Sequence, residues 1–94
     1  MEYYIVVNEW NYPTETGREL IGDFDTREAA DREAECQYKA EYDNFLDVTH
    51  GEIYQMACGK DVNHLGETIG YSLHSSSIEE EDFFFQSAII KRYV

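Results

Sequence analysis

Five side chains have the chemistry of metal ligands or nucleophiles: His50, His64, His74, Cys36 and Cys58. Zinc modules hold their ligands in closely spaced pairs, and these five residues are too far apart to form them. Nucleophilic catalysis needs a serine or cysteine beside a base and an orienting group, yet the sequence has neither a Gly-x-Ser-x-Gly motif nor a glycine-rich phosphate loop. We therefore expect no metal, no cofactor and no enzymatic activity.

Carboxylates are the abundant charged group of the chain. It has 94 residues, with 20 Asp and Glu against 7 Lys and Arg, and a formal net charge of −13. A charge of about 2–8 is enough to keep a small domain soluble, so the excess indicates the class of partner. Because phosphate repels a polyanion, nucleic acid and anionic membranes are excluded as direct partners.

Length and composition bound the architecture. The chain supports one domain over residues 1–94, and its aliphatic and aromatic content favours a folded protein with a modest core. The start at Glu2–Val7 lacks the basic residues of a signal peptide, and no apolar run has the ~18 residues of a membrane span. We expect a cytoplasmic protein with free thiols, with a single Cys36–Cys58 disulfide as the alternative.

The first quarter of the sequence predicts a β-hairpin. Residues 2–10 are apolar on both faces, as in a central strand. Residues 13–17 contain the proline and glycine of a turn, and residues 19–24 return as a second strand.

A long helix is predicted over residues 25–46, where glycine and proline are absent. Asp25 and Glu28 fit a capping box as N-cap and N3 residue. One apolar stripe recurs at spacings of three and four, with small residues first and aromatic residues later, so that the alanine end approaches a sheet closely. The stripe consists of Ala30, Ala34, Tyr38, Tyr42 and Phe45.

The second half predicts β structure. Residues 52–58 and 68–74 are expected strands, with a glycine-bounded loop over 59–66 between them, and three serines end the pattern at 75–77. Residues 83–94 favour a strand by their aromatic and β-branched content, although a capping pattern at 77–80 leaves a helix open. The predicted fold class is α+β: a four- to five-stranded, mostly antiparallel sheet with one long helix on one face.

The helix carries most of the candidate binding residues. Spacings of three or four place carboxylates ~4.5–6 Å apart along a helix axis, similar to phosphates along a nucleic-acid strand. Three basic residues lie on the same helix, so a solvated surface is the plain alternative. Glu33 and Glu41 lie towards a flank. The acids of the 13–25 region could extend the array, namely Glu15, Glu19, Asp23 and Asp25. The predicted partner-binding residues are Glu28, Asp31, Glu33, Glu35, Asp43, Glu79, Glu80, Glu81 and Asp82.

Length, acidity and the acidic segments 25–47 and 79–82 resemble the small inhibitors encoded by bacteriophages and mobile elements, which include anti-restriction and anti-CRISPR proteins. Several of those act as DNA mimics. The resemblance implies a non-enzymatic inhibitor in the host-cell cytoplasm that binds a basic nucleic-acid-binding protein or nuclease and blocks its DNA or RNA site. It rests on no signature motif, so no functional residue is carried over. The apolar, basic end at 83–94 departs from a uniformly acidic mimic.

Two other functions are compatible with the same composition. An immunity or antitoxin-like protein inhibits a nuclease through specific contacts, in which aromatic anchors supply affinity and acids supply association rate. Its candidate anchors, which are otherwise core residues, are Trp10, Tyr12, Tyr42 and Tyr54. A homodimeric assembly or regulatory protein could instead pair through the 83–94 segment as an edge strand.

Overall fold

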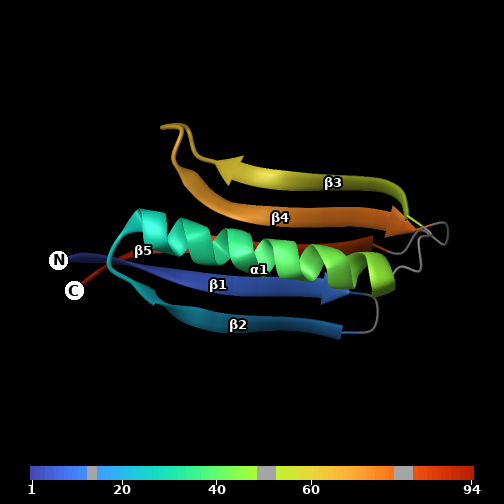
Figure 1. The fold of residues 1–94 in the computed structure, drawn as a ribbon, viewed down its shortest axis with the longest axis horizontal. Helices are drawn as coiled ribbons and strands as arrows, with labels where there is room; N and C mark the ends of the chain where they lie inside the picture. Colours follow the sequence, from blue (N-terminus) through green and yellow to red (C-terminus); the bar gives the residue numbers. More distant parts are fainter. Residues whose placement is uncertain (13–14, 49–52, 78–81) are drawn as a thin grey trace.

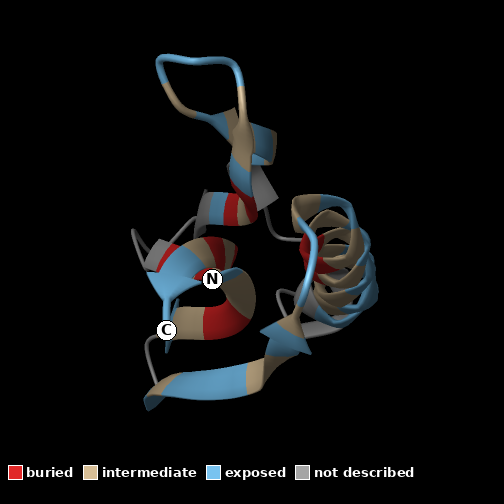
Figure 2. Ribbon diagram, turned by 90° about the vertical axis from the view of Figure 1, so that its left-hand side faces the viewer, coloured by how far each residue is buried: buried red, intermediate tan, exposed pale blue. Residues whose placement is uncertain are grey.

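Across the described residues, five strands and one helix follow in the order β1 (Glu2–Tyr12), β2 (Glu15–Phe24), α1 (Arg27–Val48), β3 (Ile53–Val62), β4 (Thr68–Ser77) and β5 (Asp82–Tyr93). The strands form one antiparallel sheet in the spatial order β2-β1-β5-β4-β3, and α1 packs on one face of it (Figure 1, Figure 2). The α+β prediction is confirmed. The computed structural model describes residues 1–12, 15–48, 53–77 and 82–94, without the side chains of 45–48, 53–57, 75–77 and 82.

β1 is a central strand, as its two apolar faces predicted. It pairs with β2 on one side and with β5 on the other. Val6 belongs to the core cluster under α1, and Val7, which points to the opposite face, is also buried. Successive side chains of a strand alternate between faces, so Asn8 points towards α1 like Val6, whereas Glu9 points away.

β2 begins at Glu15, four residues before the predicted start at Glu19. Gly17 pairs with Trp10 in the ladder, and a Cβ added to Gly17 would lie 2.2 Å from Cζ2 of the Trp10 ring. Because Gly17 has no side chain, the Trp10 indole can lie directly against β2. The sequence predicts Gly17 in a turn, whereas in the structure it allows this close approach of the ring to the strand. The predicted turn residues 13–14 lie outside the described residues.

α1 begins and ends two residues later than predicted. Its N-cap is Thr26, because the amide of Ala29 donates a hydrogen bond to Thr26 Oγ1 at 3.2 Å. The predicted capping box from Asp25 to Glu28 is therefore wrong by one residue. Asp and Thr are both good N-caps, so adjacent candidates cannot be separated by residue type alone.

The apolar stripe of α1 faces the sheet as predicted. Ala30 and Ala34 are fully buried in a cluster with Val6 of β1, Tyr71 of β4 and Ile89 of β5. Tyr38 and Tyr42 pack farther along against a second cluster that contains Leu73. The side chain of the last stripe residue, 45, lies outside the described part of the chain.

The third and fourth strands are longer than the sequence indicated. β3 continues to Val62, so the predicted loop over 59–66 shrinks to the residues after it. Gly59 lies within the strand with a φ of +146°, a conformation that side chains rarely adopt. β4 runs through Ser77, because ladder hydrogen bonds to β3 and β5 need no apolar side chain.

β5 settles the ambiguous last segment as a strand. It lies between β1 and β4, hydrogen-bonded on both sides, and the sheet edges are β2 and β3. The interpretation of 83–94 as an edge strand available for dimer pairing is therefore wrong. Long runs of aromatic and β-branched residues are typical of central strands too, which explains why sequence could not distinguish the two positions.

Candidate functional site

The predicted acidic face of α1 is divided by the sheet beneath it. Glu28 and Asp43 are exposed, whereas Asp31, Glu33 and Glu35 are partly buried against neighbouring side chains. Two regions result, one on each side of the helix. The β4 flank comprises Arg27, Asp31, Glu35, Lys39, Glu67 and Tyr71. The β2 flank comprises Asn8, Trp10, Tyr12, Glu15, Glu19, Glu33, Gln37, Glu41 and Asn44.

On the β4 flank, a buried phenol holds two carboxylates. The Tyr71 hydroxyl, on a residue only 4% exposed, donates to Asp31 Oδ1 and lies 3.2 Å from Glu35 Oε2. Burial and the two carboxylates raise the pKa of Tyr71, so the hydroxyl keeps its proton and remains a donor. Lys39 Nζ pairs with Glu35 at 2.9 Å, and this ammonium and the Tyr71 hydroxyl lower the pKa of Glu35.

Arg27 completes the β4 flank at the start of the helix. Its guanidinium donates to the carbonyl oxygen of Thr68 at 3.0 Å and pairs with Glu67 Oε2 at 3.5 Å. The same guanidinium lies 5.0 Å from the centroid of the Tyr4 ring. The charges of this flank thus tie the helix to the sheet and partly cancel one another.

The β2 flank encloses a cavity of about 290 Å³ between α1 and the β1–β2 hairpin. Three carboxylates line it, those of Glu15 and Glu19 from β2 and Glu41 from α1, and among the described residues that line it none is a lysine, arginine or histidine. Glu41 is held in place by the Tyr12 hydroxyl, which donates to Oε1, and by Asn44 Nδ2 at 3.3 Å. Burial comes first and Glu41 second among the causes that raise the pKa of Tyr12, so this hydroxyl also stays protonated. The lining residues are Asn8, Trp10, Tyr12, Glu15, Glu19, Gln37, Glu41, Asn44 and Phe85.

A chain of amides crosses the floor of this cavity. Gln37 Nε2 donates to Glu33 Oε1 at 3.3 Å, and Asn8 Nδ2 donates to Gln37 Oε1 at 3.0 Å. Because a carboxylate only accepts, Glu33 fixes the orientation of Gln37, which in turn fixes that of Asn8. Asn8 Oδ1 is left buried without a hydrogen-bond partner among the described residues.

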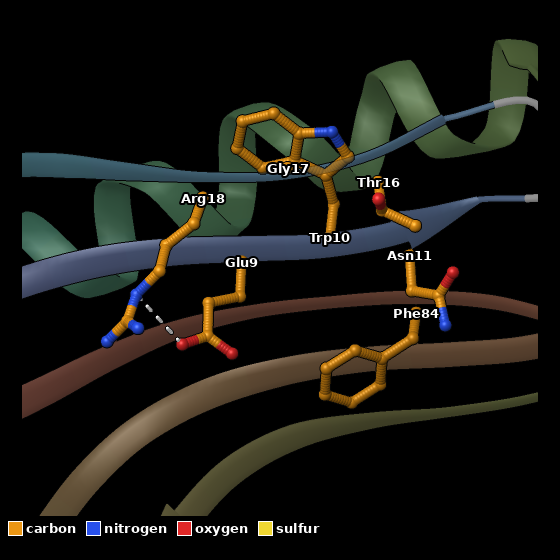
Figure 3. A pocket seen from close by; sticks show the side chains of 7 residues that line it. All are labelled: Glu9, Trp10, Asn11, Thr16, Gly17, Arg18 and Phe84. Carbon is orange, nitrogen blue, oxygen red and sulfur yellow. Dashed lines mark ion pairs between the residues drawn. The ribbon is translucent and has the colours of Figure 1, made fainter.

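A second cavity, of about 370 Å³, lies at the same end of the β1–β2 hairpin (Figure 3). Its lining includes Glu9 and Arg18, which form an ion pair at 3.2 Å, and Phe84 of β5. In Figure 3 the Trp10 indole lies at Gly17 and points away from this ion pair. Arg18 is thus occupied on the opposite face of the sheet and does not neutralise the β2 flank.

The remaining predicted residues are the acids at 79–82 and the aromatic candidates. Glu79, Glu80 and Glu81 lie outside the described residues, as does the side chain of Asp82, so their proposed role stays a prediction. The aromatic candidates of the β2 side, Trp10 and Tyr12, and also Tyr42, are half-buried and pack against the core, whereas the side chain of Tyr54 is not described.

The described residues give little support for metal binding or for chemistry at the two thiols. Within them, no three His, Cys, Asp or Glu side chains are grouped so that they could hold a metal ion. Cys36 and Cys58 are both exposed and unbonded to each other. Nor does any helix of the described part combine the length and apolar character that crossing a membrane requires.

Asn8, Gln37 and Asn44 are polar residues of this site that sequence analysis missed, and Asn8 is the one with a signal in the sequence. It interrupts the apolar run of β1, and a polar residue in a two-sided apolar strand is a signal of a buried polar contact. Glu15, Glu19 and Glu41 were considered only as extensions or flanks of the helix face. Their convergence depends on the hairpin lying beside the second half of α1, which no local pattern specifies.

Scans against protein-family models, curated proteins and solved structures found no match to this chain. Its function is therefore argued from its own residues.

Proposed function

We propose that this protein is a non-enzymatic acidic inhibitor, acting in the cytoplasm, that binds a basic nucleic-acid-processing protein and occupies its DNA or RNA site. Restriction and CRISPR-type defence machinery are the receptors that its resemblance to phage inhibitors suggests. The observation that carries the proposal is the β2 flank, where Glu15, Glu19 and Glu41 line one cavity and no described lining residue is a base.

Unpaired carboxylates on one surface repel one another and cost folding stability, whereas a basic receptor would relieve that repulsion on binding. The charges also raise the association rate with a positively charged groove. The net charge of −13 gives the whole molecule the sign of the nucleic acid that it would displace. Glu28 and Asp43, exposed on α1, would extend the contact surface beyond the cavity.

Inhibition through specific contacts, without mimicry of nucleic acid, is the second candidate. It is favoured by Trp10 and Tyr12, because these aromatic residues line the same cavity as the carboxylates. Aromatic side chains dominate the binding energy of many protein interfaces. In that case Tyr12→Ala should weaken binding more than the loss of any single carboxylate.

The test begins with affinity capture from a host lysate at low and high salt, followed by identification of the bound proteins. The expected receptor is a basic nucleic-acid-binding protein, released by salt, whose DNA or RNA binding is competed by this chain. A receptor that binds this chain and nucleic acid simultaneously would contradict the proposal. So would an affinity that does not change between about 50 and 500 mM salt, because exposed charge pairs are screened over ~8–10 Å.

A further inference from the structure

One residue that lines the β2-flank cavity carries a buried acceptor that no described residue satisfies. Asn8 is only 6% exposed, lines the cavity, and has no partner at Oδ1 within the described residues. The hydrogen-bond chain from Glu33 through Gln37 fixes this orientation, since reversing the Asn8 amide would place two acceptors against each other. Buried acceptors without a donor are costly, so this one indicates a donor supplied from outside.

The three carboxylates that line the cavity are also acceptors. Glu15 and Glu19 reach it from β2, and Glu41 reaches it from α1 with its carboxylate oriented by Tyr12 and Asn44. A ligand that satisfies them must be cationic and must carry several donors. The carboxylates are spread over different walls and form no metal-binding group among the described residues, which disfavours a single metal ion.

The shape of the cavity narrows the choice among organic cations. Its volume of about 290 Å³ is at the small end of ligand sites and suits one side-chain head group. Trp10, Tyr12 and Phe85 supply aromatic surface, on which a planar guanidinium stacks better than a compact ammonium. Five N–H donors in a fork match acceptors that lie in several directions.

We infer that this cavity binds the guanidinium of one arginine side chain, presented by the protein partner. Asn8 Oδ1 accepts from the head group at the floor, Glu41 and Glu19 form charge-assisted hydrogen bonds at the walls, and Trp10 contacts its plane. The identity of the source, an arginine of a basic receptor, rests on the proposed function. The guanidinium site itself does not.

A capped Gly-Gly-Arg-Gly-Gly peptide provides the test, with the citrulline peptide as its neutral isostere. The chain has a single tryptophan, so the indole N–H resonance of Trp10 reports directly on the cavity. We expect saturable shifts of this resonance with the arginine peptide and none with the citrulline peptide at equal concentration. Equal binding of a capped lysine peptide would overturn the guanidinium assignment.

Matched charge variants locate the site. Glu41→Gln and, separately, Glu19→Gln should each weaken binding about tenfold, the loss expected for a charge-assisted hydrogen bond. Glu28→Gln makes the same change of charge on exposed α1 surface and should weaken binding less than twofold. If all three variants weakened peptide binding equally, the loss would reflect general electrostatic attraction to an acidic protein. That result would overturn the inference.

Three further outcomes test the source of the guanidinium and the proposed function separately. Methylguanidinium binding without peptide binding would overturn the assignment to a protein side chain, since the cavity would then admit only a free small cation. If the arginine peptide binds but the full chain never competes with nucleic acid for its receptor, the proposed function fails while the site stands. If competition holds but no peptide binds the cavity, the inference fails alone.

Discussion

The two flanks of α1 carry carboxylates in opposite circumstances. On the β4 flank, Asp31 and Glu35 accept from a buried tyrosine, and Glu35 also pairs with Lys39. On the β2 flank, Glu15 and Glu19 line a cavity to which no base contributes among the described lining residues. The same residue type thus serves folding on one side and lacks a basic neighbour among the described lining residues on the other.

This difference explains how a small sheet tolerates such a charge. Paired and hydrogen-bonded carboxylates contribute stability, whereas uncompensated ones reduce it through repulsion. Local conflicts of this kind are expected at functional sites, where stability is given up for binding. Net charge alone cannot reveal the division, because both flanks contribute acids to it.

The largest effect is expected from Tyr71→Phe, which removes the donor shared by Asp31 and Glu35. The free energy of unfolding should fall by about 2 kcal/mol, the scale of hydrogen bonds to charged groups. Tyr12→Phe is the matched change on the β2 flank and should cost about 1 kcal/mol, because Glu41 keeps Asn44 as a donor. Urea denaturation measures both, and equal losses would remove the contrast between the flanks.

Gly17→Ala should distort the β2-flank cavity through its wall. The new Cβ would lie 2.2 Å from the Trp10 ring, so the indole must move, at a cost of about 1.5 kcal/mol. Gly22→Ala in the same strand meets the Phe24 ring only at 3.6 Å and should change stability by less than about 0.5 kcal/mol. A thermal melt of each variant, with tryptophan fluorescence, distinguishes them. An unchanged Trp10 signal in Gly17→Ala would contradict the packing described.

Neutralising the β2 flank should stabilise the protein. Glu15→Gln with Glu19→Gln removes two uncompensated charges, and the unfolding free energy should rise by about 0.5 kcal/mol at low salt. The gain should shrink as salt is added, because screening relieves the same repulsion. A loss of stability at low salt would show that these carboxylates have partners within the fold.

The smallest effect is a pH dependence confined to the β4 flank. The Lys39 ammonium, followed by the Tyr71 hydroxyl, lowers the pKa of Glu35 from its ordinary value of 4.5. A lowered folded-state pKa contributes stability above the unfolded pKa that is lost as pH falls through the folded value. The stability difference between the unchanged protein and Glu35→Gln should therefore be constant near neutral pH and decline below the ordinary value. A difference independent of pH would contradict this assignment.

The sequence pattern was sufficient to predict the helix and the strands, but it was insufficient to predict which residues line the β2-flank cavity. Alternation in β1 and the stripe containing Ala30 and Tyr38 predicted which faces meet, because burial imposes the periods of strand and helix. The pairing of β5 between β1 and β4 is a long-range choice that local residues do not encode. Asn8 and Glu41 line one cavity because the β1–β2 hairpin lies beside α1, which no local pattern specifies, so a site built on both was beyond sequence analysis.

The central claim is that charge on the β2 flank is available to a basic partner while charge on the β4 flank is used by the fold. The most direct measurement is the affinity of a labelled nona-arginine peptide, by fluorescence anisotropy, for three forms of the chain: unchanged, Glu15→Gln with Glu19→Gln, and Asp31→Asn with Glu35→Gln. Both variants remove two charges, so they reduce long-range attraction equally. We predict at least a fivefold loss of affinity for the first variant and less than a twofold loss for the second. Equal losses, or a greater loss for the second, would contradict the account.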